Sequence, residues 1–141
     1  MQKISLVNLI IGFSALFLAM CGGFFISYDA EKAFLYDKTL LASWQYTLLK
    51  SAHGHLTLFG VLHVLFGLTL PYSQLGLSSK KLQTLGLFLG SCAMGILMLI
   101  RAYYGPKAQF DFSAIFIGTF LSAATLSIAI HIYGLILKLR T

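Results

Sequence analysis

Four long stretches of the chain contain no charged residue, and this pattern predicts its main elements. These stretches cover residues 4–28, 51–79, 82–100 and 112–137. A helix needs roughly 20 apolar residues to cross about 30 Å of hydrocarbon, and an isolated strand cannot satisfy its backbone in lipid. We therefore predict four membrane-spanning helices, near residues 5–27, 52–71, 82–101 and 113–137.

The connections between these helices differ in length. Residues 29–50 form a long first connection, and residues 33–50 mix apolar with polar positions. We expect an interfacial helix there, lying on the outer surface. Aromatic residues would anchor it in the headgroups, namely Tyr28, Tyr36, Trp44 and Tyr46.

The second and third connections are short, with Pro71 and Pro106 marking turns. Short connections favour antiparallel neighbours. The fold class predicted is all-α, an integral membrane four-helix up-down bundle with an interfacial helix in the first loop. The whole chain, 1–141, forms a single transmembrane domain.

The first apolar run also raises the alternative of a cleaved signal peptide. It spans about 24 residues, whereas the apolar region of a signal is about 7–15 residues long. We therefore expect it to be retained as a membrane helix.

Composition and charge agree with a lipid environment. Hydrophobic residues make up 58% of the chain and charged residues 10%, against about 25% in soluble domains. The net charge of +6 does not indicate a nucleic-acid partner, because the basic residues lie at helix ends, where they anchor spans in headgroups.

The two sides of the membrane carry equal numbers of Lys and Arg. One side has Lys3, Lys80, Lys81, Lys138 and Arg140, and the other has Lys32, Lys38, Lys50, Arg101 and Lys107. The second side also holds all four acids. Its first loop is long, so the lysines of that loop carry less weight in the positive-inside rule. We expect a bacterial inner-membrane protein with both termini in the cytoplasm.

Each predicted span carries small residues at helical spacing, such as Gly12, Gly60, Gly86, Gly90 and Gly118. Small residues let helix backbones approach closely in lipid. For the first, third and fourth spans this packing role is the preferred interpretation.

All four histidines lie inside predicted spans: His53, His55 and His63 on the second and His131 on the fourth. Ionisable residues at membrane depth are rare and usually functional. The alternative for each is a neutral histidine that hydrogen-bonds a neighbouring helix. Three histidines on one helix and a fourth across the bundle favour a site.

The second span offers a surface for a flat cofactor. His53, Gly60 and Gly67 fall on one face at about 100° per residue. A histidine above two glycines would suit a haem, whose iron takes axial histidines. His63 is the second-span histidine nearest in depth to His131, so these two are the pair that could share one iron.

Copper is the alternative cofactor, because imidazole, Met and Cys all bind it. His53 or His55 would then need ligands such as Met20, Met94 or Met98, although methionine in an apolar helix is usually core. Cys21 and Cys92 are expected to be buried, inert thiols. No zinc-type cysteine pair, phosphate loop or Ser-His-Asp grouping is present in the sequence.

The segment from Ala52 to Gly60, continuing to Pro71, contains the pattern HxHxxLFG. It resembles the histidine-bearing second helix of small membrane proteins related to subunit I of the haem-copper oxidases, and also the nitric-oxide-response membrane family. The resemblance implies haem or copper binding through His53 and His55, with Gly60 matching the family glycine. The chain lacks most of the twelve spans of an oxidase, so no complete oxygen-reducing centre is expected.

Two functions follow as expectations. The first is a membrane protein that binds haem or copper for electron transfer, gas sensing or haem-enzyme assembly. Its candidate ligands and cofactor-facing residues are His53, His55, His63, His131, Gly60 and Gly67. The second is a cofactor-free accessory or structural subunit of a membrane complex. Partners in either case are the lipid bilayer and other membrane subunits or further copies of the chain.

Overall fold

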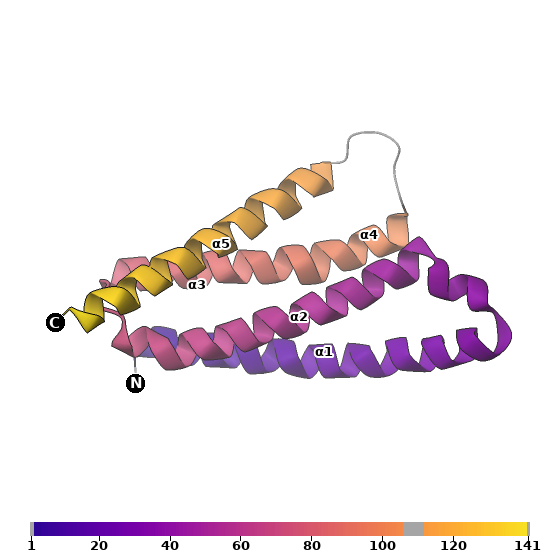
Figure 1. Cartoon of the computed structure of the whole chain (residues 1–141), viewed down its shortest axis with the longest axis horizontal. Coiled ribbons are helices and arrows are strands. Elements are labelled where there is room, and N and C mark those ends of the chain that lie inside the picture. The colour runs from indigo at the N-terminus through magenta and orange to yellow at the C-terminus, as the bar shows by residue number, and fades with distance from the viewer. Residues whose placement is uncertain (1, 106–111, 141) are drawn as a thin grey trace.

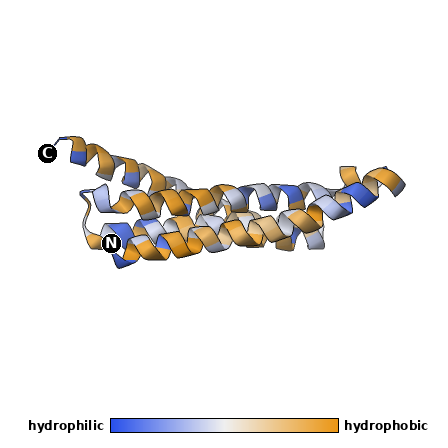
Figure 2. Cartoon of the chain, turned by 90° about the horizontal axis from the view of Figure 1, so that it is seen from below, coloured by the Kyte–Doolittle hydropathy of each residue, from blue (hydrophilic) through white to orange (hydrophobic). Residues whose placement is uncertain are grey.

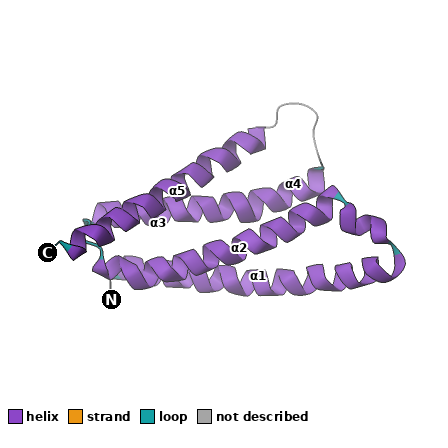
Figure 3. Cartoon of the chain, viewed as in Figure 1, coloured by secondary structure: helices purple, strands orange, loops and turns teal. Residues whose placement is uncertain are grey.

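The computed structural model describes residues 2–105 and 112–140, and these residues are almost entirely helical (Figure 1; Figure 3). In chain order the elements are α1 (Lys3–Tyr36), the 3-10 helix η1 (Lys38–Ala42), α2 (Trp44–Thr69), the 3-10 helix η2 (Leu70–Tyr72), α3 (Leu77–Cys92), the π-helix η3 (Ala93–Leu97), α4 (Met98–Tyr104) and α5 (Phe112–Leu139). No strand occurs in the described ranges, which confirms the all-α fold class.

Four continuous helical segments are long and apolar enough to cross a membrane. They are Lys3–Tyr36, Trp44–Tyr72, Leu77–Tyr104 and Phe112–Leu139, and each contains one predicted span. Figure 2 shows hydrophobic colour along most of their length, with the hydrophilic positions gathered mainly toward the ends. The prediction of four long apolar helices is therefore confirmed by length and composition.

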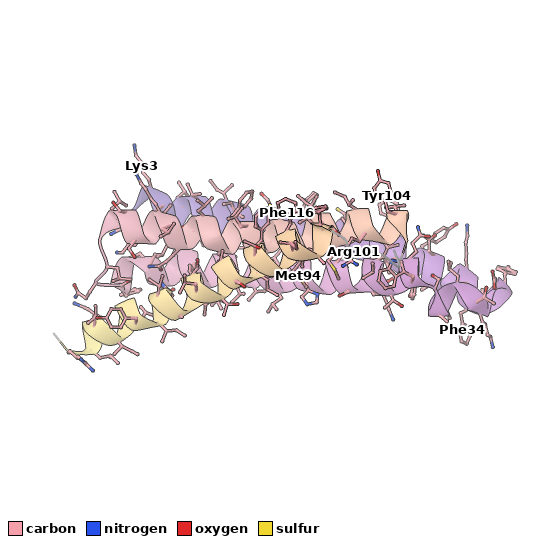
Figure 4. The ribbon with its side chains drawn as sticks, turned by 90° about the horizontal axis from the view of Figure 1, so that it is seen from above. Lys3, Phe34, Met94, Arg101, Tyr104 and Phe116 are labelled. Carbon is pink, nitrogen blue, oxygen red and sulfur yellow. The ribbon has the colours of Figure 1, made fainter. Side chains whose placement is uncertain are left out.

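The interfacial helix predicted over residues 33–50 is wrong. α1 instead continues without a break to Tyr36, and α2 already begins at Trp44. The two helices form one hairpin that extends past the end of α4, with Phe34 far out on it (Figure 1; Figure 4). At about 1.5 Å per residue, the 34 residues of α1 measure about 51 Å, well beyond about 30 Å of hydrocarbon.

Two polar side chains form hydrogen bonds with the backbone at the two ends of the turn between α1 and α2. The carboxylate of Asp37 accepts hydrogen bonds from the backbone N–H and the hydroxyl of Thr39, at 3.0 and 2.5 Å. The hydroxyl of Ser43 accepts from the backbone N–H of Tyr46 at 3.1 Å and so caps the start of α2. Asp37 thus caps the start of η1 directly after α1 ends, and Ser43 caps the start of α2, which leaves no room for a separate surface helix.

The helices pack as antiparallel neighbours, α1 along α2 and α3 along α5, with α2 also contacting α3 and α4. Both ends of the chain lie at the same end of the molecule in Figure 1. The apolar core consists of Phe59, Phe66, Leu87 and Ala124, with Met94 packed against it. Met94 is therefore partly buried and has a packing role, as methionines in apolar helices usually do.

Small residues mark the closest helix contacts. A Cβ added to Gly12 would lie 2.8 Å from the carbonyl oxygen of Gly60, and one added to Gly90 would lie 2.5 Å from the Cβ of Ala124. The packing role predicted for these glycines is confirmed. Gly118 differs, because nothing lies within 4 Å of its added Cβ. The buried residues of α5 all lie from Ala124 onward, and none of the described residues before it is buried.

Candidate functional site

The predicted histidines fall into two separate buried clusters and an outer pair. His63 and His131 lie in the clusters, which are built where α2 meets α1, α3 and α5. His53 and His55 lie nearer the hairpin end of α2. Each histidine has its own hydrogen-bond partners, which decide what each ring nitrogen can do.

His63 is fully buried, with 0% of its surface exposed. Its Nδ1 lies 2.9 Å from Oδ1 of Asn8 on α1. Its Nε2 is buried and has no hydrogen-bond partner among the described residues. A buried ring nitrogen without a partner is uncommon in proteins, and it points to a missing water, ion or ligand.

Asn8 links this histidine to a third helix. Its amide nitrogen donates to the carbonyl of Ile4 at 3.0 Å and to the hydroxyl of Thr84 on α3 at 2.7 Å. The Thr84 hydroxyl in turn donates to the carbonyl of Lys80 at 3.0 Å. A chain of hydrogen bonds therefore joins α1, α2 and α3 around His63.

Both ring nitrogens of His131, by contrast, are engaged. Nε2 lies 2.8 Å from the hydroxyl of Thr69 on α2, and Nδ1 lies 3.2 Å from Oε1 of Gln83 on α3. Its ring also stacks on Phe66, with 4.3 Å between the ring centroids. His131 thus binds α5 to two other helices and offers no open nitrogen to a metal.

The outer histidines do not meet the inner ones. The ring of His53 lies against Gly23 of α1, where an added Cβ would come within 2.8 Å of its Cε1. Its Nδ1 is buried without a partner in the described part of the chain. His55 Nδ1 bonds the carbonyl of Ser51 one turn earlier, at 2.7 Å. At about 1.5 Å per residue, His53 and His63 are about 15 Å apart along α2.

The glycine face proposed for a haem is filled. An added Cβ at Gly60 would lie 2.9 Å from Cγ of Leu16, and one at Gly67 would lie 2.6 Å from Cγ of Leu9. Both leucines belong to α1, which packs directly on this face. The donor nitrogen of His63 suits a haem iron, but the surface at Gly60 and Gly67 does not fit a flat macrocycle while α1 lies there.

One groove beside α1 has no histidine in its lining among the described residues. This groove of about 530 Å³ lies between α1 and the α3–η3 segment, and its lining includes Ser14, Ser91, Cys92 and Gly95. Within the described part of the chain, no three His, Cys, Asp or Glu residues gather as a metal-binding group. Cys21 and Cys92 are both free thiols, and Cys21 is exposed rather than buried as predicted.

The residues that sequence reasoning missed are the polar partners of the histidines. Asn8, Gln83 and Thr84 are all buried. Asn8 is the only asparagine in the chain, and it lies inside an uncharged stretch of 25 residues, 4–28. An amide at membrane depth needs an interhelical partner, so this residue carried a usable signal.

Comparison with protein families, with curated proteins and with solved structures finds no match for this chain. The geometry of the chain's own residues therefore carries the inference about its function. The feature of that geometry with the clearest chemical meaning is the open, buried Nε2 of His63.

Proposed function

We propose that this chain is a polytopic membrane protein that binds a metal centre through Nε2 of His63. The observation that carries the proposal is that this nitrogen is buried and unpartnered, while Nδ1 is tied to Asn8. Histidines that bind metals almost always give their other ring N–H to a protein acceptor. His63 has this arrangement before any metal is considered.

The metal centre is a copper ion or a haem, and the two place different demands on the fold. A copper ion needs no flat surface, but it needs ligands besides His63, and no three His, Cys, Asp or Glu residues gather in the described part of the chain. A haem needs only one or two protein nitrogens, but on the glycine face it would require Leu9 and Leu16 to move away. Electron transfer, gas sensing and haem-enzyme assembly are the roles that such a centre serves in this proposal.

The test is an absorption spectrum of the protein purified in mild detergent, oxidised and then reduced with dithionite, together with copper analysis. A haem gives a Soret band that sharpens with α and β bands on reduction, and copper appears in the elemental analysis. His63→Ala should abolish the signal. Thr84→Val, which weakens the same cluster but keeps the ligand, should retain it, and so should His55→Ala.

If the protein expressed with added haem and copper shows no haem bands and contains no copper, this proposal is refuted. That result would leave the second candidate, a cofactor-free subunit of a membrane complex. Two observations favour that candidate: His131 uses both nitrogens to join helices, and α5 carries no buried residue before Ala124 among those described. A subunit of this kind should stay bound to a partner during gentle detergent extraction. Chemical crosslinking should join the two chains.

A further inference from the structure

We propose that Asn8 is the positioning residue of this site, because it sets the tautomer of His63 and leaves Nε2 as the coordinating atom. This inference rests on the proposed function of His63, but its central claim, the position of one proton, can be measured without any metal. Asn8 itself touches neither the open nitrogen nor any bound group. It acts through the ring.

The orientation of the Asn8 amide follows from its neighbours. The atom that faces Ile4 lies 3.0 Å from a backbone carbonyl, which can only accept a hydrogen bond. The same atom lies 2.7 Å from the Thr84 hydroxyl, whose proton is already directed to the carbonyl of Lys80. Both contacts require a donor, so this atom is the amide nitrogen and the oxygen points to His63.

The tautomer of His63 follows in turn. The amide oxygen 2.9 Å from Nδ1 can only accept, so Nδ1 carries the proton. A neutral ring then has a bare lone pair on Nε2. A doubly protonated ring would bury a second N–H without an acceptor among the described residues, which is unfavourable in a protein interior.

His131 provides an internal comparison for a histidine that serves packing. Both of its nitrogens have side-chain partners, Thr69 and Gln83, and its face is covered by Phe66. His63 has one partner of defined polarity and one open nitrogen. A histidine required only to join α1 and α2 would not need the three hydrogen bonds that hold Asn8 in a single orientation.

The first experiment is nitrogen-15 NMR of the metal-free wild-type protein labelled at histidine, with His63 assigned by comparison with His63→Ala. We expect a protonated Nδ1 and an unprotonated Nε2. A proton on Nε2, or an even mixture of tautomers, overturns the inference. This measurement uses the wild-type fold and therefore does not depend on any variant being stable.

The second experiment compares Asn8→Leu, which keeps the side-chain size but removes the acceptor, with the matched control Gln83→Leu, which removes a buried amide that bonds His131 instead. In Asn8→Leu the proton of His63 should no longer be confined to Nδ1, so both tautomers should be present. The variant should also bind copper(I) about 10- to 100-fold more weakly, as measured by competition with a chelator. Gln83→Leu leaves all three hydrogen bonds of Asn8 in place and should preserve both the tautomer of His63 and the copper(I) affinity. An unchanged tautomer or an unchanged affinity in Asn8→Leu overturns the inference.

Failure of the proposed function is a distinct outcome. If the wild-type protein binds neither copper(I) nor haemin, the metal proposal is wrong, and the NMR result still decides whether Asn8 sets the tautomer. If the wild-type protein binds metal through His63 and Asn8→Leu binds it equally well, the function stands and the role of Asn8 is overturned.

Discussion

The contact between α1 and α2 can be tested with two alanine substitutions on the same helix. At Gly12 an added Cβ would lie 2.7 Å from Cγ2 of Val64 and 2.8 Å from both the carbonyl oxygen of Gly60 and the backbone nitrogen of Val64. Two of these three atoms belong to the backbone, so the helices must separate. At Gly22 nothing lies within 4 Å of an added Cβ.

Both substitutions gain helix propensity, but only one of them also overpacks a helix contact. Replacing a helical glycine by alanine gains about 1 kcal/mol of helix propensity at either position. Overpacking a close contact costs about 1–3 kcal/mol, and only Gly12→Ala incurs it. Gly22→Ala should therefore be the more stable variant, by roughly 1–3 kcal/mol.

The assay is reversible unfolding in mixed detergent micelles, followed by circular dichroism, with both variants measured beside the wild type. Equal midpoints for Gly12→Ala and Gly22→Ala would refute the packing of α1 on the glycine face of α2. That result would also reopen this face to a haem, because Leu9 and Leu16 would no longer be held over Gly67 and Gly60.

Three further predictions follow from other contacts. Gln83→Leu removes a hydrogen-bond partner of His131 and should lower the free energy of unfolding by about 0.6 kcal/mol, an average for interhelical hydrogen bonds in membranes, whereas no change would mean that the bond does not form. Hydrogen bonds from the Thr39 side chain and backbone N–H lower the pKa of the Asp37 carboxyl, so the capped turn should be stable at neutral pH and loosen as pH falls through that lowered pKa. The Thr39 amide should then lose its protection from hydrogen exchange, measured against an unstructured peptide at the same pH, as the carboxylate is protonated, and in Asp37→Ala it should lack this protection at every pH. Reporter fusions at the two ends of the chain should respond from the same side of the membrane, expected to be the cytoplasm, and opposite responses would contradict the four-span arrangement.

Sequence reasoning succeeded where one physical constraint dominates. The thickness of the hydrocarbon layer demands long uncharged runs, and these runs can be seen without any structure. Close packing in lipid demands small residues, so Gly12 and Gly90 could be assigned to helix contacts. The first connection was predicted wrongly, because helix continuation beyond the membrane depends on local caps. Asp37 caps the start of η1 directly after α1 ends, and Ser43 caps the start of α2.

The sequence by itself determined that this chain has four long apolar helices and that its histidines lie inside two of the uncharged runs, because hydropathy and charge spacing are local properties. Only the tertiary structure decided which histidine keeps an open nitrogen. His131 and His63 look alike in the sequence, yet Thr69 and Gln83 occupy both nitrogens of one, while Asn8 occupies a single nitrogen of the other. Those partners come from different helices, and their pairing depends on how the helices rotate against one another, which no local pattern encodes.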